Sequence, residues 1–271
     1  MSPSVSLVVT DLDGTLWHRH DEVHEDTMAA LAKVAELGVP LLVATGRRVK
    51  TTREPLARVG VAPPAVVLNG ALGVDLASGG RFHRAAYPTG QAIEVLAAFT
   101  SVGLSPVVYV DHPRYDVYLA PAPSTHPDHA AMLRPTAGVD DLERVVAEEV
   151  VLGFGLIGIP VEAGEAAVRA IGDRAELHLD RSLDHPGMSA LTVAPRGQSK
   201  WDGVLAFCAA RGLDATRVLA LADGPNDVEL LDHAMLRLVP GNAHRSALDR
   251  ADHLIGPAVD GGWAEVVRFL G

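Results

Sequence analysis

The chain of 271 residues contains little that would direct it to an oxidising compartment or into a membrane. It has a single cysteine, Cys208, so no disulfide can form within the chain, and the sequence favours a reducing cytoplasm. No apolar run approaches the roughly 20 residues that span a bilayer, and the first residues lack a basic segment followed by an apolar one. We therefore expect a soluble cytoplasmic protein without a membrane partner.

Basic residues are also scarce. The chain has 23 Lys and Arg against 34 Asp and Glu, which gives a net charge of −11. Nucleic acid and anionic membranes both require a basic face, so neither is expected as a partner. A small anionic substrate is compatible with this charge, because its site needs only a few local cations. The apolar fraction of 48% indicates a globular protein.

Segments typical of strands alternate with segments typical of helices, which predicts an α/β fold with a mostly parallel sheet. The pattern of segments and the composition change after about residue 84, and prolines and histidines are frequent over 112–135. We predict a Rossmann-like core of residues 1–84 and 188–271, with an inserted α+β domain over 85–187. The core strands are expected over 5–10, 39–44, 65–68, 191–193 and 218–222, and its helices over 25–37, 200–211 and 262–270.

A glycine pattern over 153–158 matches a dinucleotide-binding fingerprint literally. Ile159 and Pro160 continue it in place of a helix, and no acidic residue is expected at the end of a following strand unless Asp180 serves. We therefore interpret this segment as a glycine-bearing strand of the inserted domain.

The first predicted strand runs directly into Asp11-Leu12-Asp13-Gly14-Thr15. Ligands of open α/β sheets bind beyond the carboxyl ends of the strands, so these two carboxylates are placed for chemistry. Gly14 lets the chain curl so that both can approach one centre. An Asp-rich turn is the ordinary alternative, and a calcium loop is disfavoured because the intervening ligand positions are apolar or basic.

Three further polar groups fall at the same expected edge of the sheet. Thr45-Gly46-Arg47 follows the second strand, Ser199-Lys200 begins a helix, and Asp223-Gly224-Pro225-Asn226-Asp227 follows a late strand. Each has an ordinary structural explanation as a helix cap, a turn or a solvated side chain. Their shared position at strand ends favours a common site instead.

Taken in order, these four groups resemble the four motifs of the haloacid dehalogenase superfamily. The spacing and the insertion after the third core strand resemble its Cof-like phosphatases, which carry a type IIB cap. Two positions depart from the family pattern, since Trp201 and Ala222 stand where relatives usually have glycine.

The resemblance implies hydrolysis of a small phosphorylated metabolite, such as a sugar phosphate, through an aspartyl-phosphate intermediate. Asp11 would attack phosphorus, and Asp13 would protonate the leaving group and then accept a proton from water. Mg²⁺ would be held by the Asp11 and Asp223 carboxylates and the Asp13 backbone carbonyl, with Asp227 in support. The remaining implied residues are Thr45 and Lys200 as catalytic groups and Leu12, Gly46, Arg47 and Asn226 as substrate-binding groups.

Two other functions are compatible with parts of this pattern. A phosphomutase shares the motifs but returns the phosphoryl group to its ligand. A non-catalytic sensor would bind a phosphorylated metabolite without turnover, although binding alone does not require both Asp11 and Asp13.

Overall fold

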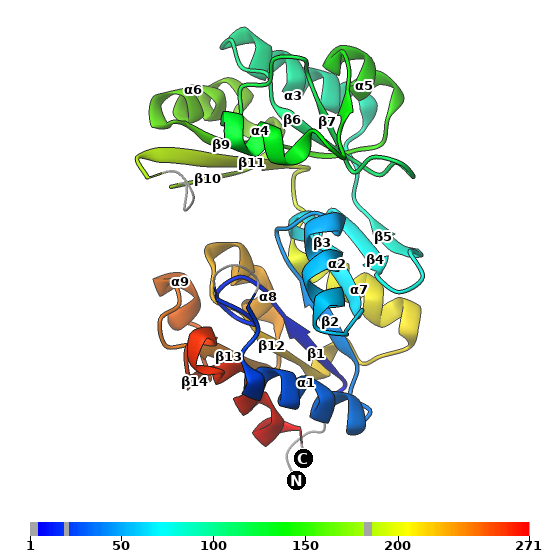
Figure 1. Ribbon diagram of the computed structural model, residues 1–271, viewed down its shortest axis with the longest axis vertical. Helices are drawn as coiled ribbons and strands as arrows, with labels where there is room; N and C mark the ends of the chain where they lie inside the picture. Colours follow the sequence, from blue (N-terminus) through cyan, green and yellow to red (C-terminus); the bar gives the residue numbers. More distant parts are fainter. Residues whose placement is uncertain (1–4, 19–21, 182–185, 271) are drawn as a thin grey trace. The chain divides into compact units, whose positions relative to one another are not determined.

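The computed structural model describes residues 5–18, 22–181 and 186–270, and the chain divides into two compact units (Figure 1). The first unit contains residues 1–83 and 199–271, and the second contains residues 84–198. Each unit is built on its own sheet with helices packed against it. The predicted α/β class is therefore confirmed.

The first unit has an eight-stranded sheet in the order β14-β13-β12-β1-β2-β3-β4-β5. Neighbours from β14 to β3 are parallel, and β4 is antiparallel to β3. Every residue of β1 is buried, as expected for a parallel strand covered on both faces. The strands are β1 Leu7–Thr10, β2 Leu41–Ala44, β3 Pro64–Val67, β4 Leu72–Asp75, β5 Arg81–Arg84, β12 Val218–Leu221, β13 Leu236–Pro240 and β14 His253–Ile255.

Helices connect these strands, because a parallel pair requires a crossover. One apolar cluster joins β1, β2 and β12 to α7 and α8, and α1 packs against the 3₁₀ segment η6. The helices are α1 Glu25–Glu36, α2 Val49–Arg58, α7 Lys200–Arg211, α8 Val228–His233 and α9 Arg245–Leu248, with 3₁₀ segments η1 Leu68–Gly70, η3 Ala215–Arg217, η4 Pro225–Asp227, η5 Ala258–Asp260 and η6 Gly262–Phe269.

The second unit has a six-stranded sheet in the order β10-β11-β9-β6-β7-β8. Its pairs are antiparallel except β7 with β8, and its largest apolar cluster includes side chains of α3, α5 and α6. The glycine pattern over 153–158 lies inside β9, as predicted. The elements are α3 Thr89–Ser101, β6 Val107–Val110, β7 Val117–Leu119, α4 Pro127–Leu133, β8 Gly138–Val139, α5 Leu142–Glu148, β9 Val151–Pro160, α6 Val161–Ile171, η2 Gly172–Arg174, β10 Glu176–Arg181 and β11 Met188–Ala194.

Two predictions about the core differ from the structure. The strand expected there over 191–193 is part of β11, which pairs with β9 and β10 in the second sheet. The second unit therefore continues to residue 198, eleven residues beyond its predicted end at 187. An apolar strand carries no local mark of the sheet that it joins, so long-range pairing decided the place of β11. The predicted last helix over 262–270 is the 3₁₀ segment η6.

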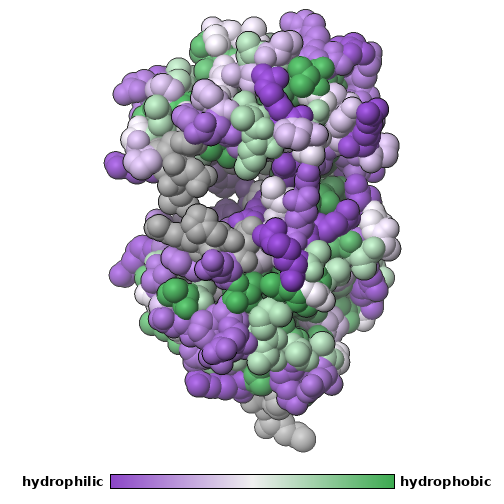
Figure 2. Space-filling view, in the orientation of Figure 1, coloured by the Kyte–Doolittle hydropathy of each residue, from purple (hydrophilic) through white to green (hydrophobic). Residues whose placement is uncertain are grey.

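Hydrophilic and hydrophobic side chains are interspersed over the visible face of each unit (Figure 2). Among the described residues, no helix combines the length and apolar character needed to cross a bilayer.

We predict that Gly203→Ala destabilises the protein, although alanine favours helix more than glycine does. A Cβ atom at Gly203 in α7 would lie 2.4 Å from Val66 Cγ1 on β3. Overpacking of this kind costs about 1–3 kcal/mol of unfolding free energy. Denaturant unfolding checks the prediction, with Gly90→Ala as the control, because nothing lies within 4 Å of a Cβ at that helical position. Equal stability of the two variants would contradict the packing argument.

Candidate active site

The carboxyl ends of three neighbouring strands form one edge of the first sheet. β1 lies between β12 and β2 and pairs parallel with both. Asp11 directly follows β1, Thr45 directly follows β2, and Asp223 comes two residues after β12. Parallel neighbours end at the same edge, which is where open α/β sheets bind their ligands.

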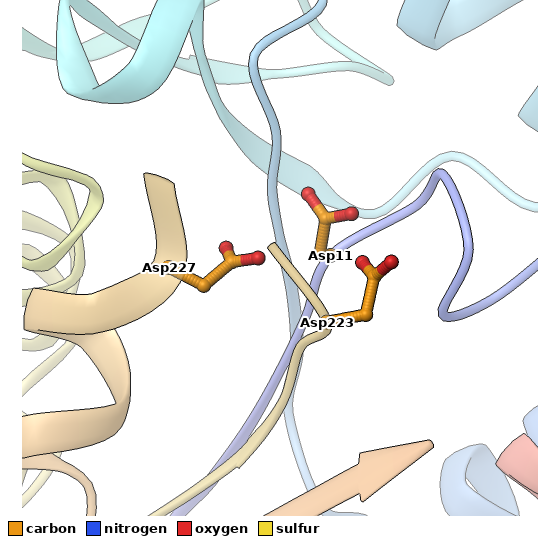
Figure 3. A group of neighbouring side chains, drawn as sticks. All are labelled: Asp11, Asp223 and Asp227. Atoms are coloured by element: carbon orange, nitrogen blue, oxygen red, sulfur yellow. The ribbon is translucent and has the colours of Figure 1, made fainter. Parts of the chain in front are cut away.

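Three acidic side chains gather at this edge. One oxygen from each of Asp11, Asp223 and Asp227 lies within 4.8 Å of the others. Figure 3 shows the three carboxylates converging from the loop after β1 and from the segment that follows β12. Asp227 ends η4, where its Oδ2 accepts a hydrogen bond from the Gly224 amide at 2.9 Å. Carboxylates that lie this close repel one another unless a cation or a proton offsets their charge.

Lys200 supplies one positive charge to this group. Its ammonium donates to Asp11 Oδ1 at 2.7 Å and to Asp227 Oδ1 at 2.6 Å, and the side chain is fully buried. Lys200 is the first residue of α7, and the Ser199–Asp202 capping box fixes the start of that helix. Gly70 allows the close approach, since a Cβ there would lie 2.0 Å from the Ser199 carbonyl oxygen.

The charges of this group do not balance. Burial raises the pKa of Asp11 well above its usual range, and Asp227 and Asp223 add to the effect against the opposing charge of Lys200. Burial, reinforced by Asp227, raises the pKa of Asp223 to about 6. Burial alone would lower the pKa of Lys200, but the two carboxylates outweigh it and raise that pKa.

Three carboxylates facing one ammonium leave an excess of negative charge in a mostly buried space. A divalent cation would offset this excess, and the oxygen donors match the ligands that hard cations prefer. The acidic residues therefore fit a divalent metal ion.

Gly14 is required where it stands, for two reasons. Its φ of +84° favours glycine, and a Cβ at this position would lie 2.2 Å from Asp223 Oδ2. The next residue, Thr15, donates a hydrogen bond to Asp223 Oδ1 at 3.1 Å. The loop after β1 thus carries Asp11 and also holds Asp223 through Thr15, a role not predicted from the sequence.

The loops after β2 and β3 form a second polar group. The hydroxyl of Thr45 accepts a hydrogen bond from the Arg47 amide at 3.2 Å. Asn69, in η1, accepts one from Asn226 Nδ2 at 3.0 Å, and a Cβ at Gly46 would lie 3.0 Å from the same Asn69 oxygen. Asn69 was not predicted as a site residue, although it directly follows the strand predicted over 65–68.

Asp13 lies outside the three-carboxylate group and is half exposed. Its carboxylate is held by Arg47, which donates to Oδ2 through Nε at 2.6 Å and to Oδ1 through Nη2 at 2.5 Å. The resemblance implied that Arg47 binds substrate, whereas the structure pairs its guanidinium with Asp13. The Leu12 side chain is fully buried, so only backbone groups of Leu12 could face a ligand.

The two departures from the family pattern are sequence neighbours of candidate site residues, since Trp201 follows Lys200 and Ala222 precedes Asp223. Trp201 is buried and stacks on His233, with ring centroids 5.3 Å apart. Ala222 is fully buried within the apolar cluster of the first unit. Both residues therefore contribute to packing.

Comparisons with known proteins identify a family for this chain. The family model for haloacid dehalogenase-like hydrolases matches residues 8–267. HMP-PP phosphatase of Citrobacter koseri is 26% identical over 92% of this chain and 88% of its own length. A phosphoglycolate phosphatase of Methanopyrus kandleri is 24% identical, covering 98% of this chain and 97% of its own. A pyridoxal phosphate phosphatase of Escherichia coli is 22% identical, covering 92% of this chain and 93% of its own.

Solved structures show the same fold. A superfamily phosphatase from Bacteroides thetaiotaomicron aligns with a TM-score of 0.79 and 22% identity, over 99% of this chain and 96% of its own. A subclass IIB sugar phosphatase aligns with a TM-score of 0.76 and 18% identity, over 97% of this chain and 98% of its own. The matched family and these relatives lead to one conclusion: the chain belongs to the haloacid dehalogenase-like hydrolases, as a Cof-like phosphatase.

Proposed function

We propose that this phosphatase hydrolyses a small phosphomonoester with the help of Mg²⁺, through an aspartyl-phosphate on Asp11. The observation that carries the proposal is the position of Asp11, which touches a buried lysine and lies within 4.8 Å of two further carboxylates at the sheet edge. Within the described part of the chain, Asp11 Oδ2 accepts no hydrogen bond and is the oxygen we assign to attack.

In this proposal Asp11 attacks phosphorus and displaces the alkoxide. Asp13 gives a proton to the leaving group and later takes one from the water that hydrolyses the phosphoenzyme. Its half-exposed carboxylate suits a group that must exchange protons with solvent.

The other site residues handle the phosphoryl charge. The Lys200 ammonium offsets the negative charge of the phosphoryl group. The Thr45 hydroxyl and the backbone amides of Leu12 and Gly46 donate hydrogen bonds to the phosphoryl oxygens. We assign Asn226 to the same surface through its bond with Asn69. Arg47 acts there only if it leaves Asp13.

Mg²⁺ would be held by the carboxylates of Asp11 and Asp223 and the backbone carbonyl of Asp13, with Asp227 in support. When bound, it would reduce the repulsion between the nucleophile and the phosphate. The oxygen-only donor set supports Mg²⁺ over softer metals.

A sugar phosphate is the proposed substrate class, and the structural likeness to a sugar phosphatase supports it. The names of the relatives span several small phosphorylated metabolites. A screen of such metabolites with Mg²⁺, measuring released phosphate, tests the proposal. Continued release supports a phosphatase, whereas interconversion of phosphate isomers or binding without turnover would replace it with a mutase or a sensor.

Replacing the nucleophile should abolish turnover. Asp11→Asn keeps the size of the side chain, but an amide cannot attack phosphorus, so we expect a loss of at least about a thousandfold in kcat. Steady-state hydrolysis of 4-nitrophenyl phosphate measures it. The matched control is Asp232→Asn, a surface carboxylate paired with Arg250, which should keep wild-type turnover. Near-normal activity of Asp11→Asn would refute the aspartyl-phosphate mechanism.

Removing a metal ligand should abolish both activity and metal binding. We expect Mg²⁺ to raise the melting temperature of the wild type and not that of Asp223→Ala, because ligand binding stabilises only a protein that retains the site. Chelator should stop phosphate release, and Mg²⁺ should restore it. Ca²⁺ should restore little, since its looser coordination does not hold nucleophile and phosphate in line. Full activity in excess chelator would exclude this arrangement.

A further inference from the structure

Trp17 contacts the carboxylate of Asp13 directly. Its indole Nε1 donates a hydrogen bond to Asp13 Oδ1 at 3.0 Å. Trp17 is fully buried, whereas the Asp13 carboxylate is half exposed. A rigid, anchored ring therefore holds one side of a carboxylate whose other side reaches solvent.

The same indole also supports the second partner of Asp13. The guanidinium of Arg47 lies over the Trp17 ring, 4.9 Å from its centroid. Arg47 Nη1 donates to the Thr51 carbonyl oxygen at 3.1 Å, which leaves Nε and Nη2 to reach Asp13. Trp17 thus acts on Asp13 twice, through its N–H and through the arginine stacked on it.

The backbone makes this arrangement stiff. The Gly14 amide donates to the Trp17 carbonyl oxygen at 2.9 Å, the Trp17 amide donates to the Leu12 carbonyl oxygen at 3.1 Å, and Asp13 and Trp17 form an isolated β-bridge. The loop from residue 11 to residue 17 is therefore closed on itself. The backbone of Trp17 is therefore tied to the segment that carries both aspartates.

The hydrogen bonds distinguish the two oxygens of Asp13. Oδ1 accepts hydrogen bonds from Trp17 and from Arg47, and these two bonds occupy both lone pairs of Oδ1. Oδ2 accepts only from Arg47 Nε among the described residues, so one lone pair is left. A proton exchanged with a ligand is therefore directed to Oδ2.

We propose that Trp17 is a positioning residue that fixes the Asp13 carboxylate with Oδ2 toward the leaving group. This inference rests on the proposed role of Asp13 as the proton donor. Trp17 itself touches no reacting atom. Its loss should therefore affect substrates whose leaving group needs a proton, and spare those whose leaving group departs as a stable anion.

Trp17→Phe tests this inference, because it keeps an aromatic ring and removes the N–H donor. The readout is kcat/KM for 4-nitrophenyl phosphate and for phenyl phosphate, which differ mainly in how much the leaving group needs protonation. We expect Trp17→Phe to lower the phenyl phosphate value by about tenfold, a part of the 10²–10⁴ that general acid catalysis typically supplies, and to change the nitrophenyl value by less than about twofold. The ratio of the two values is independent of the fraction of folded enzyme.

Two comparisons separate the explanations. Trp263→Phe also removes a buried indole donor, here to Thr10 Oγ1 at 2.9 Å, and should leave the ratio unchanged. Asp13→Asn should change the ratio most. An unchanged ratio in Asp13→Asn overturns the proposed acid, whereas a changed ratio there with an unchanged ratio in Trp17→Phe overturns the role of Trp17 alone.

A second variant controls for the packing that is lost when phenylalanine replaces the larger indole. Benzothienylalanine at position 17 keeps the bicyclic shape of the indole and replaces the N–H with sulfur. The same change in ratio is expected, and a wild-type ratio would overturn the inference.

Discussion

The buried ammonium of Lys200 is the interaction on which the rest of the site depends. It joins Asp11, which follows β1, to Asp227 in η4. In the chain, Asp11 is 189 positions from Lys200 and Asp227 is 27 positions from it. Removing either partner of a buried ion pair leaves an uncompensated charge, which is strongly destabilising. The capping box at Ser199, the missing side chain at Gly70 and the packing of Gly203 against Val66 all serve to place this one atom.

The acidic residues of the site are held in two different ways. Asp11, Asp223 and Asp227 share a mostly buried space with one lysine, so their charges depend on one another and favour a cation. Asp13 is half exposed and has its own partners, Arg47 and Trp17. This separation gives two carboxylates of one short loop different environments, and environment is what assigns different chemical roles to identical side chains.

The insertion of the second unit also bears on the site. The chain returns to the first unit at Ser199, and the next residue is Lys200. Lys200 therefore begins the first helix after the return. The last strand of the second sheet, β11, ends at Ala194, so only residues 195–198 lie between it and Ser199.

The sequence by itself determined the α/β class, the order of the motifs and the edge of the sheet at which they meet. These depend on local signals: buried apolar strands that end in aspartate, a capping serine, and a glycine at a sharp turn. It did not determine that Arg47 would pair with Asp13, that Asn69 would contact Asn226, or that β11 would join the second sheet. Those contacts join residues far apart in the chain, and only strand order and packing bring such residues together. Tertiary structure therefore decided the partners, while local sequence signals had already placed the candidate site residues at the strand ends.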